Sequence, residues 1–363
     1  MGCRIAGCGK AVPQLTVTND DLAKLVDTSD EWIVERTGIR QRRIAVEETA
    51  TDLAAAACKK ALARAGMAAG DIDLLVCMTI SPDSIVPSQA SLVRAQVGLE
   101  NAVAFDLNAA CTGCVYGMEA ASTMIEASML SQGAGSALSH KRNPMARALV
   151  VGTERLSRIV DWTDRATCVL FGDGAGAVVL EWDGEAPGIL GSYLKNTDDD
   201  TLCLTCDQIF DMSTFPFGGQ AACESVGGIM GIEAVDGEGN PAGTAPHHPF
   251  ISMNGQRVFK FATTAIVEAA REVCERTGVA LDEVKCIVPH QANDRIIRYA
   301  AKKLGVPYER WQVSIGEVGN TSASSVLMAL ADAYGDGRIQ PGDKVMLVGF
   351  GGGLTSGALL FEA

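Results

Sequence analysis

The sequence contains no apolar run near the ~20 residues that a membrane-spanning helix needs. Its first residues lead directly into strand-like sequence, without the pattern of a signal peptide. Basic residues are fewer than acidic ones, 30 against 44, and the resulting net charge of −14 disfavours general binding to phosphate-rich nucleic acids. We therefore expect no membrane insertion, no nucleic-acid partner and, for 12 cysteines without an export signal, reduced thiols in a cytoplasmic protein.

Charged residues are also scarce, at 20% of the chain, whereas hydrophobic residues make up 47% and glycines number 39. This composition is typical of a compact α/β enzyme and not of a disordered or fibrous chain. Short β-rich apolar runs alternate with longer alanine-rich helical runs, which predicts a layered α/β architecture. The predicted strands are 73–78, 148–151, 286–288 and 344–348, and the predicted helices are 52–65, 89–97, 114–129, 256–276, 294–304 and 322–333.

The chain also resembles two copies of one plan. In each half a strand is followed by a polar turn, at 108–113 and at 319–324, and then by an alanine-rich helix, a strand, a glycine-rich turn and a strand. The boundary falls near 182–188. We predict a first half at 1–182 and a second half at 183–363, with one site between them.

Two stretches, 131–147 and 196–249, do not fit this plan and are predicted to be lids, binding loops or interface elements. The second stretch holds a candidate zinc set, formed by Cys203, Cys206 and Cys223 with His247 or His248. Irregular spacing makes zinc the weaker alternative. A redox role for the C-x-x-C at 111–114 is weaker still, because the chain is too long for the small thioredoxin-like fold.

Cys111 lies where a polar turn meets a predicted helix start. Helix N-terminal amides and the helix dipole stabilise a thiolate, which can attack a thioester. Alone, Cys111 could equally be a core cysteine, as most of the other eleven are expected to be.

A catalytic cysteine needs a histidine that is close in space, and the chain has only four histidines. His140, His247 and His248 fall in the two irregular stretches, whereas His290 directly follows the buried strand at 286–288. The carboxyl end of a strand is a common place for an α/β active site. His290 is therefore the candidate partner, although a structural histidine stays an alternative.

Asn320 is the third candidate, because the repeat alignment places it where Cys111 lies in the first half. An N-cap is the alternative role for this asparagine. Together the three residues suggest that Cys111 accepts an acyl group while His290 and Asn320 donate hydrogen bonds to the enolate left when a malonyl thioester loses carbon dioxide. The glycines at 351–353 would let backbone amides approach the acyl oxyanion.

Six motifs resemble the β-ketoacyl-acyl carrier protein synthase III family of the thiolase superfamily, in order along nearly the whole chain. They are DEWIVERTGIR at 30–40, NAACTG at 108–113, FGDGAG at 171–176, HQAN at 290–293, GNTSAS at 319–324 and GFGGG at 349–353. The resemblance implies a duplicated thiolase-like fold with five layers, α/β/α/β/α, and a cytoplasmic homodimer. It also implies an acyltransferase that condenses an acyl-CoA starter with malonyl-acyl carrier protein to initiate fatty acid biosynthesis, with no cofactor and no metal.

The resemblance also implies roles for individual residues. Cys111, His290 and Asn320 match the catalytic triad, and Gly352 with the Cys111 amide matches the oxyanion hole. Residues that match the coenzyme A site are Trp32, Arg36, Arg165, Gln256 and Asn293. An indole and a guanidinium, from Trp32 and Arg165, suit stacking on adenine.

A cluster of basic residues is the candidate dock for the acidic carrier protein: Arg257, Lys260, Arg295, Arg298, Lys302 and Lys303. An ordinary solvated helix face is the alternative. At the acyl pocket, Val86 matches a position that the opposite subunit of the family lends to the pocket floor and that often holds phenylalanine. Valine there predicts a pocket for branched or longer acyl groups than acetyl.

Two other functions stay open at this point. A condensing enzyme or acyltransferase of secondary metabolism would use the same triad. A catalytically silent acyl-binding protein on this fold is the alternative from another class, and the intact Cys, His and Asn argue against it.

Overall fold

The computed structural model describes residues 2–131, 145–185, 188–207 and 249–363. Its larger sheet has the order β1 (Gly2–Ala11), β7 (Asp173–Asp183), β6 (Arg147–Arg155), β4 (Leu74–Met78) and β5 (Val103–Leu107). The second has the order β8 (Ile189–Asn196), β13 (Thr355–Glu362), β12 (Lys344–Gly351) and β11 (Val284–Pro289). In both sheets two parallel strands are followed by two antiparallel ones, β4–β6–β7–β1 and β11–β12–β13–β8. The second sheet thus repeats four strands of the first.

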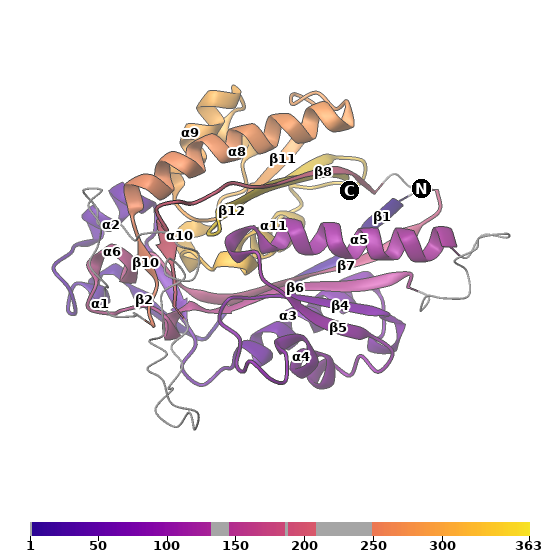
Figure 1. Cartoon of the computed structure of the whole chain (residues 1–363), viewed down its shortest axis with the longest axis horizontal. Helices are drawn as coiled ribbons and strands as arrows, with labels where there is room; N and C mark the ends of the chain where they lie inside the picture. Colours follow the sequence, from indigo (N-terminus) through magenta and orange to yellow (C-terminus); the bar gives the residue numbers. More distant parts are fainter. Residues whose placement is uncertain (1, 132–144, 186–187, 208–248) are drawn as a thin grey trace.

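Helices form three layers around the two sheets, so the five-layered fold is confirmed (Figure 1). Between the sheets lie α5 (Gly113–Ser131) and α11 (Ser325–Gly335), whose apolar residues join strands of both sheets in one core cluster. Because a sheet covers each side of α11, that helix is buried almost all round. The outer layers are α3 (Ala50–Ala65) with α4 (Gln89–Val97), and α8 (Gly255–Thr277) with α9 (Asp294–Leu304).

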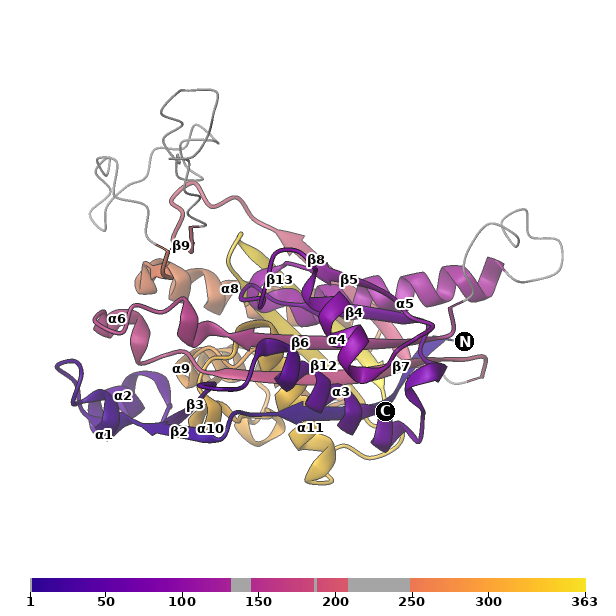
Figure 2. The ribbon, with the colours of Figure 1, turned by 90° about the horizontal axis from the view of Figure 1, so that it is seen from below.

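Short elements gather at one end of the molecule, where Figures 1 and 2 both place α1, α2, β2 and α6. The short elements are β2 (Leu15–Thr18), α1 (Asn19–Leu22), α2 (Asp30–Thr37), β3 (Gln41–Ile44), α6 (Arg165–Cys168), β9 (Leu204–Thr205), β10 (Ser252–Met253) and α10 (Ile315–Val318). Single 3₁₀ turns complete the set: η1 (Ala69–Asp71), η2 (Ala110–Thr112), η3 (Leu156–Arg158), η4 (Tyr308–Arg310) and η5 (Ser322–Ser324).

Most of both irregular stretches lies outside the described residues, so their predicted roles stay predictions. The boundary between the halves also stays a prediction, although β7 ends at Asp183 and β8 of the second sheet begins at Ile189. Among the helices in the described ranges, none combines the length and apolar character needed to cross a bilayer.

Candidate active site

The two polar turns singled out in the sequence have the same backbone conformation. Each is a 3₁₀ turn, η2 or η5, that leads into a helix between the sheets. Ala110 and Ser322, the first residues of the two turns, have φ values of 45° and 47°. Such positive φ values are uncommon outside glycine, so their recurrence marks equivalent positions in the two halves.

This equivalence corrects the alignment made from the sequence. The Asn108 side chain accepts a hydrogen bond from the Ala110 N–H at 3.2 Å, and the Asn320 side chain accepts one from the Ser322 N–H at 2.9 Å. Asn320 therefore corresponds to Asn108 and not to Cys111, and the sequence alignment was wrong by three residues. The error arose because both turns are short and polar, and the sequence alone does not mark the residue with positive φ.

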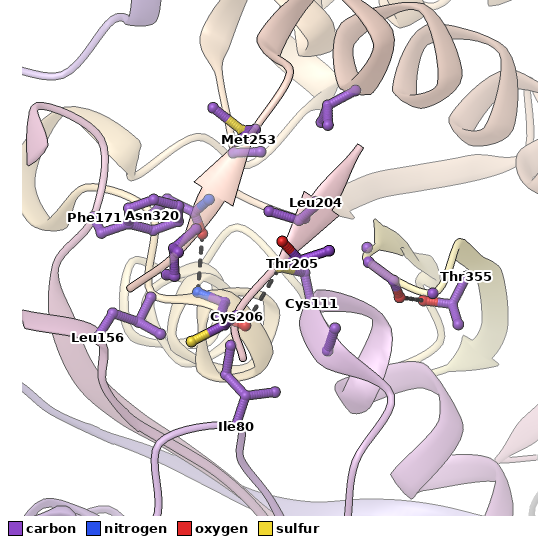
Figure 3. A pocket seen from close by; sticks show the side chains of 18 of the residues that line it. Ile80, Cys111, Leu156, Phe171, Leu204, Thr205, Cys206, Met253, Asn320 and Thr355 are labelled. Atoms are coloured by element: carbon purple, nitrogen blue, oxygen red, sulfur yellow. Dashed lines mark hydrogen bonds between the residues drawn. The ribbon is translucent and has the colours of Figure 1, made fainter. Parts of the chain in front are cut away.

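One cavity is lined by all three proposed triad residues, of which Figure 3 labels Cys111 and Asn320. Cys111 lies in η2, His290 directly follows β11, and Asn320 lies two residues before η5 begins. Their exposed fractions are 8%, 1% and 7%, so the reacting groups are largely shielded from water. In Figure 3, Cys111 and Asn320 border the same space, with apolar Leu156 and Ile80 beside it.

The Cys111 thiol is held in a dry environment. Its Sγ lies 3.3 Å from the Ser322 hydroxyl, which comes from the second half of the chain. Burial raises the pKa of the Cys111 thiol to about 11, although the hydrogen bond with Ser322 lowers that pKa in part. The expectation that the helix start would favour a thiolate is therefore outweighed by burial, and the thiol is protonated at neutral pH.

This raised pKa predicts how fast iodoacetamide alkylates Cys111 in the free protein. Because only the thiolate reacts, the rate should rise about tenfold for each pH unit from about pH 7 to about pH 10. Mass spectrometry of the peptide that contains Cys111 separates its rate from those of the other cysteines. A rate that levels off below about pH 9 would mean that the thiol is more acidic than this burial allows.

His290 and Asn320 are both uncharged side chains with a nitrogen that can donate a hydrogen bond. Burial lowers the pKa of His290 to about 3, so its ring is uncharged at neutral pH. The Nδ1 atom of the ring lies 2.7 Å from the Ser325 hydroxyl, which leaves Nε2 for the cavity. Since the Ser322 N–H already occupies the side-chain oxygen of Asn320, the amide nitrogen is the group that Asn320 has left to donate.

The glycine run at 351–353 approaches Cys111 closely. A Cβ at Gly351 would lie 2.8 Å from the Cys111 nitrogen, whereas one at Gly352 would first meet Leu204, at 3.5 Å. Any side chain at Gly351 would therefore crowd the Cys111 amide. Sequence analysis singled out Gly352 for the oxyanion hole, and that role stays a prediction.

Three of the five predicted coenzyme A contacts line the cavity: Arg36, Gln256 and Asn293. The Asn293 side chain donates to the Arg36 carbonyl at 3.0 Å, which ties α9 to α2. Trp32 and Arg165 are not among the lining residues. The Arg36 and Arg165 guanidinium carbons lie 4.5 and 4.9 Å from the Trp32 ring centre, so an adenine stacked between Trp32 and Arg165 requires Arg165 to move.

The predicted basic cluster covers adjacent helices. Arg295, Arg298, Lys302 and Lys303 are exposed on α9, while Lys260 is exposed and Arg257 half-buried in the first two turns of α8. The α8 and α9 helices pack together in one hydrophobic cluster, and the Arg295 guanidinium carbon lies 5.8 Å from the centre of the Phe259 ring on α8. One of them, Arg298, forms a 2.6 Å ion pair with Asp294 on its own helix.

Val86 does not line the cavity of its own chain. Its exposed fraction is 85%, and that of Ile85 beside it is 64%. Ile85 and Ser84 do line the cavity, so Val86 is at the outer edge of that wall. A contact between Val86 and an acyl group therefore requires a second subunit.

Sequence reasoning missed a buried carboxylate, Glu154, that joins the two halves. It accepts hydrogen bonds from the Ser81 hydroxyl at 2.6 Å, the Ile80 N–H at 3.1 Å and the Ala323 N–H at 3.4 Å. Burial raises its pKa to about 7. The only signal in the sequence is an acidic residue directly after the apolar run of β6, which is too common a pattern to single out.

The structure describes only two of the candidate zinc ligands, Cys203 and Cys206. Within the described ranges no three His, Cys, Asp or Glu side chains form a group that could hold a metal ion. Cys203 is buried and Cys206 lines the cavity. The other candidate ligands, Cys223, His247 and His248, lie outside the described residues, as does His140.

Known proteins are similar to this chain in sequence and in fold. Residues 136–198 match the family described as 3-oxoacyl-[acyl-carrier-protein (ACP)] synthase III, and residues 274–363 match that family's C-terminal domain. The β-ketoacyl-[acyl-carrier-protein] synthase III of Clostridium beijerinckii is 44% identical over 99% of this chain and 98% of its own length.

Two solved structures support the same relationship. The crystal structure of 3-oxoacyl-[acyl-carrier-protein] synthase III from Aquifex aeolicus has a TM-score of 0.80 and 38% identity, covering 100% of both chains. The priming β-ketosynthase of the R1128 polyketide pathway has a TM-score of 0.82 and 32% identity, covering 99% of this chain and 96% of its own. The chain therefore belongs to the β-ketoacyl-[acyl-carrier-protein] synthase III family of the thiolase superfamily.

Proposed function

We propose that this chain is a β-ketoacyl-acyl carrier protein synthase III, an acyltransferase that condenses an acyl-CoA starter with malonyl-acyl carrier protein. The observation that carries the proposal is one cavity lined by the Cys111 thiol and by two buried, uncharged side chains that can donate hydrogen bonds, His290 and Asn320. This donor set suits a reaction that passes through an enolate and needs no cofactor. Such a condensation would initiate fatty acid biosynthesis.

In the first step, the Cys111 sulfur attacks the acyl-CoA carbonyl and coenzyme A leaves as its thiol, carrying away the proton that Cys111 held. In the second step, the bond between the malonyl carboxylate and its neighbouring carbon breaks, and carbon dioxide departs. The electron pair forms an enolate whose oxygen accepts hydrogen bonds from His290 and Asn320. The enolate carbon then attacks the acyl-cysteine and gives 3-oxoacyl-carrier protein, and the Cys111 sulfur leaves as a thiolate that takes a proton from water.

The direct test supplies acyl-CoA and malonyl-acyl carrier protein and measures the products by mass spectrometry. We expect carbon dioxide, free coenzyme A and a 3-oxoacyl-carrier protein in equal amounts. Coenzyme A release without a lengthened carrier-bound product would instead indicate a plain acyltransferase. Acyl-CoA binding without any turnover would support the silent acyl-binding alternative.

Acyl preference and assembly belong to the same proposal. We propose a homodimer in which Val86 of one subunit reaches the acyl pocket of the other. Support comes from the exposure of Ile85 and Val86 and from β5, which is one of the two edge strands of the larger sheet. Exposed strand edges and apolar side chains are commonly covered by a partner.

The Val86→Phe variant tests this arrangement. If valine leaves room for branched or longer acyl groups, phenylalanine should lower kcat/KM for those substrates by about tenfold or more relative to acetyl-CoA. The matched control is Val46→Phe, which alters an exposed valine outside the cavity-lining set. Sedimentation at several concentrations checks the dimer. A wild-type preference for acetyl-CoA, or a Val86→Phe profile equal to that of Val46→Phe, would contradict the proposed pocket.

The remaining assignments are also proposals: cytoplasmic localisation, docking of the carrier protein on the α8–α9 basic cluster, and the coenzyme A contacts. The accessible cations of that cluster support the docking proposal, and the cavity-lining positions of Arg36, Gln256 and Asn293 support the coenzyme A contacts. A role in secondary metabolism is the second candidate function. It draws on the 32% identity to a solved priming β-ketosynthase, and assays with carrier proteins of the two pathways separate the candidates.

A further inference from the structure

The His290 ring is fixed on several sides by residues of the second half. Its main-chain N–H donates to the Val348 carbonyl at 2.8 Å, and its ring meets the Phe350 ring edge-on, with 5.2 Å between centres. Nδ1 lies 2.7 Å from the hydroxyl of Ser325, the first residue of α11. His290 and Ser325 are each 1% exposed, so this contact is shielded from competing water.

The hydrogen-bond partners of the Ser325 hydroxyl indicate which group donates in its contact with His290 Nδ1. A neutral imidazole carries a single N–H, on Nδ1 or on Nε2. The Gln291 N–H points at the Ser325 oxygen from 3.4 Å, so that oxygen already has a donor on one side. Among the hydrogen-bond contacts of the described residues, Nδ1 is the acceptor within reach of the Ser325 hydroxyl proton. A proton on Nδ1 would leave this buried hydroxyl without an acceptor, which disfavours that tautomer.

We propose that Ser325 is a positioning residue whose hydroxyl donates to Nδ1 of His290 and so keeps the ring proton on Nε2, the nitrogen left for the cavity. The inference rests on the proposed function, because it assigns a purpose to that proton in the decarboxylation step. As carbon dioxide leaves, Nε2–H donates to the thioester oxygen that becomes the enolate oxygen. With the other tautomer, a lone pair on Nε2 would face that oxygen and repel it.

The Ser325→Ala variant tests the role, with Ser324→Ala as its matched control. Ser324 is also buried at the start of α11, but its hydroxyl donates to the Thr321 carbonyl at 2.9 Å. We expect Ser325→Ala to lower decarboxylation of malonyl-acyl carrier protein by about 10- to 100-fold, less than the loss of a whole oxyanion donor. Acylation of Cys111 by acyl-CoA should stay within about threefold of wild type, because that step does not use the Nε2 proton.

Nitrogen NMR gives a readout that does not depend on activity. In protein carrying ¹⁵N-histidine, the His290 signals are identified by their loss in His290→Ala. We expect a protonated Nε2 and an unprotonated Nδ1 in wild type and in Ser324→Ala, and a tautomer mixture in Ser325→Ala. Protonated Nδ1 in wild type would overturn the proposal, as would equal decarboxylation rates in the two serine variants.

Two further outcomes separate this proposal from the proposed function. If wild type does not decarboxylate malonyl-acyl carrier protein, the proposed function fails, while the NMR result still decides the tautomer. If Ser325→Ala loses acylation and decarboxylation equally while Ser324→Ala keeps both, Ser325 has only a structural role and the proposal is wrong.

Discussion

The Cys111→Ala variant is expected to take up no acyl group from radiolabelled acyl-CoA, and its condensation rate should fall by at least about 10³-fold. The reason is that the covalent step needs the sulfur of Cys111, because the neighbouring Ser322 hydroxyl is a far weaker nucleophile than a thiolate. Scintillation counting of the precipitated protein, followed by mapping of the labelled peptide, measures the effect.

Cys114→Ala is the matched control, because Cys114 lies one helical turn further along and is fully buried. Burial raises the pKa of the Cys114 thiol, as it does for Cys111, but Cys114 is not among the residues that line the cavity and so does not meet the acyl-CoA. This variant should keep the label at the level of wild type. Label that persists in Cys111→Ala would place the acyl group on another residue and overturn the proposed first step.

The second large effect is expected for His290→Ala, which should separate the two half-reactions. Condensation should fall by about 10²- to 10³-fold, the usual cost of losing one donor to a developing oxyanion. Acylation of Cys111 should persist, because the His290 ring is neutral and is not paired with the thiol, whose Sγ contacts Ser322 instead. Single-turnover acylation and malonyl-carrier decarboxylation are measured on the same preparation.

The acylation half-reaction is the internal control for folding in His290→Ala. Equal losses in acylation and condensation would contradict the division of roles and would make His290 a partner of the thiol. An unchanged condensation rate would exclude His290 as an enolate donor. Asn320→Ala should repeat the pattern of His290→Ala, since the free amide nitrogen of Asn320 serves the same step.

Local patterns predicted the helices well where caps and amphipathic faces are strong. The predicted helix at 294–304 matches α9 because Asn293 caps its start and Gly305 adopts the left-handed conformation at its end. The α3 helix begins at Ala50, two residues before the prediction, because Thr49 forms a capping box with Asp52. The predicted helix at 322–333 is instead a 3₁₀ turn followed by α11, since polar turn residues precede its apolar run.

The sequence predicted those residues of the candidate site that lie in a motif. It did not predict the surroundings of these residues, which depend on contacts between segments far apart in the chain. Cys111 was predicted from its position in a polar turn and His290 from its position at a strand end, and both line one cavity in the structure. Their surroundings come from elsewhere in the chain: Ser322 lies 211 positions after Cys111, and Ser325 lies 35 after His290. The expected thiolate was wrong for the same reason, because burial by distant segments outweighs the local helix start.

The two equivalent turns also explain why a duplicated architecture has one reaction centre and not two. At the start of α11, the Glu154 carboxylate occupies the Ala323 N–H, so a second anion there would be repelled. In the other copy Gly351 lies against the Cys111 nitrogen and brings no side chain with it. The two copies thus differ by one carboxylate. Glu154 makes the turn at the start of α11 structural, and the absence of a side chain at Gly351 leaves the Cys111 turn open for the reaction.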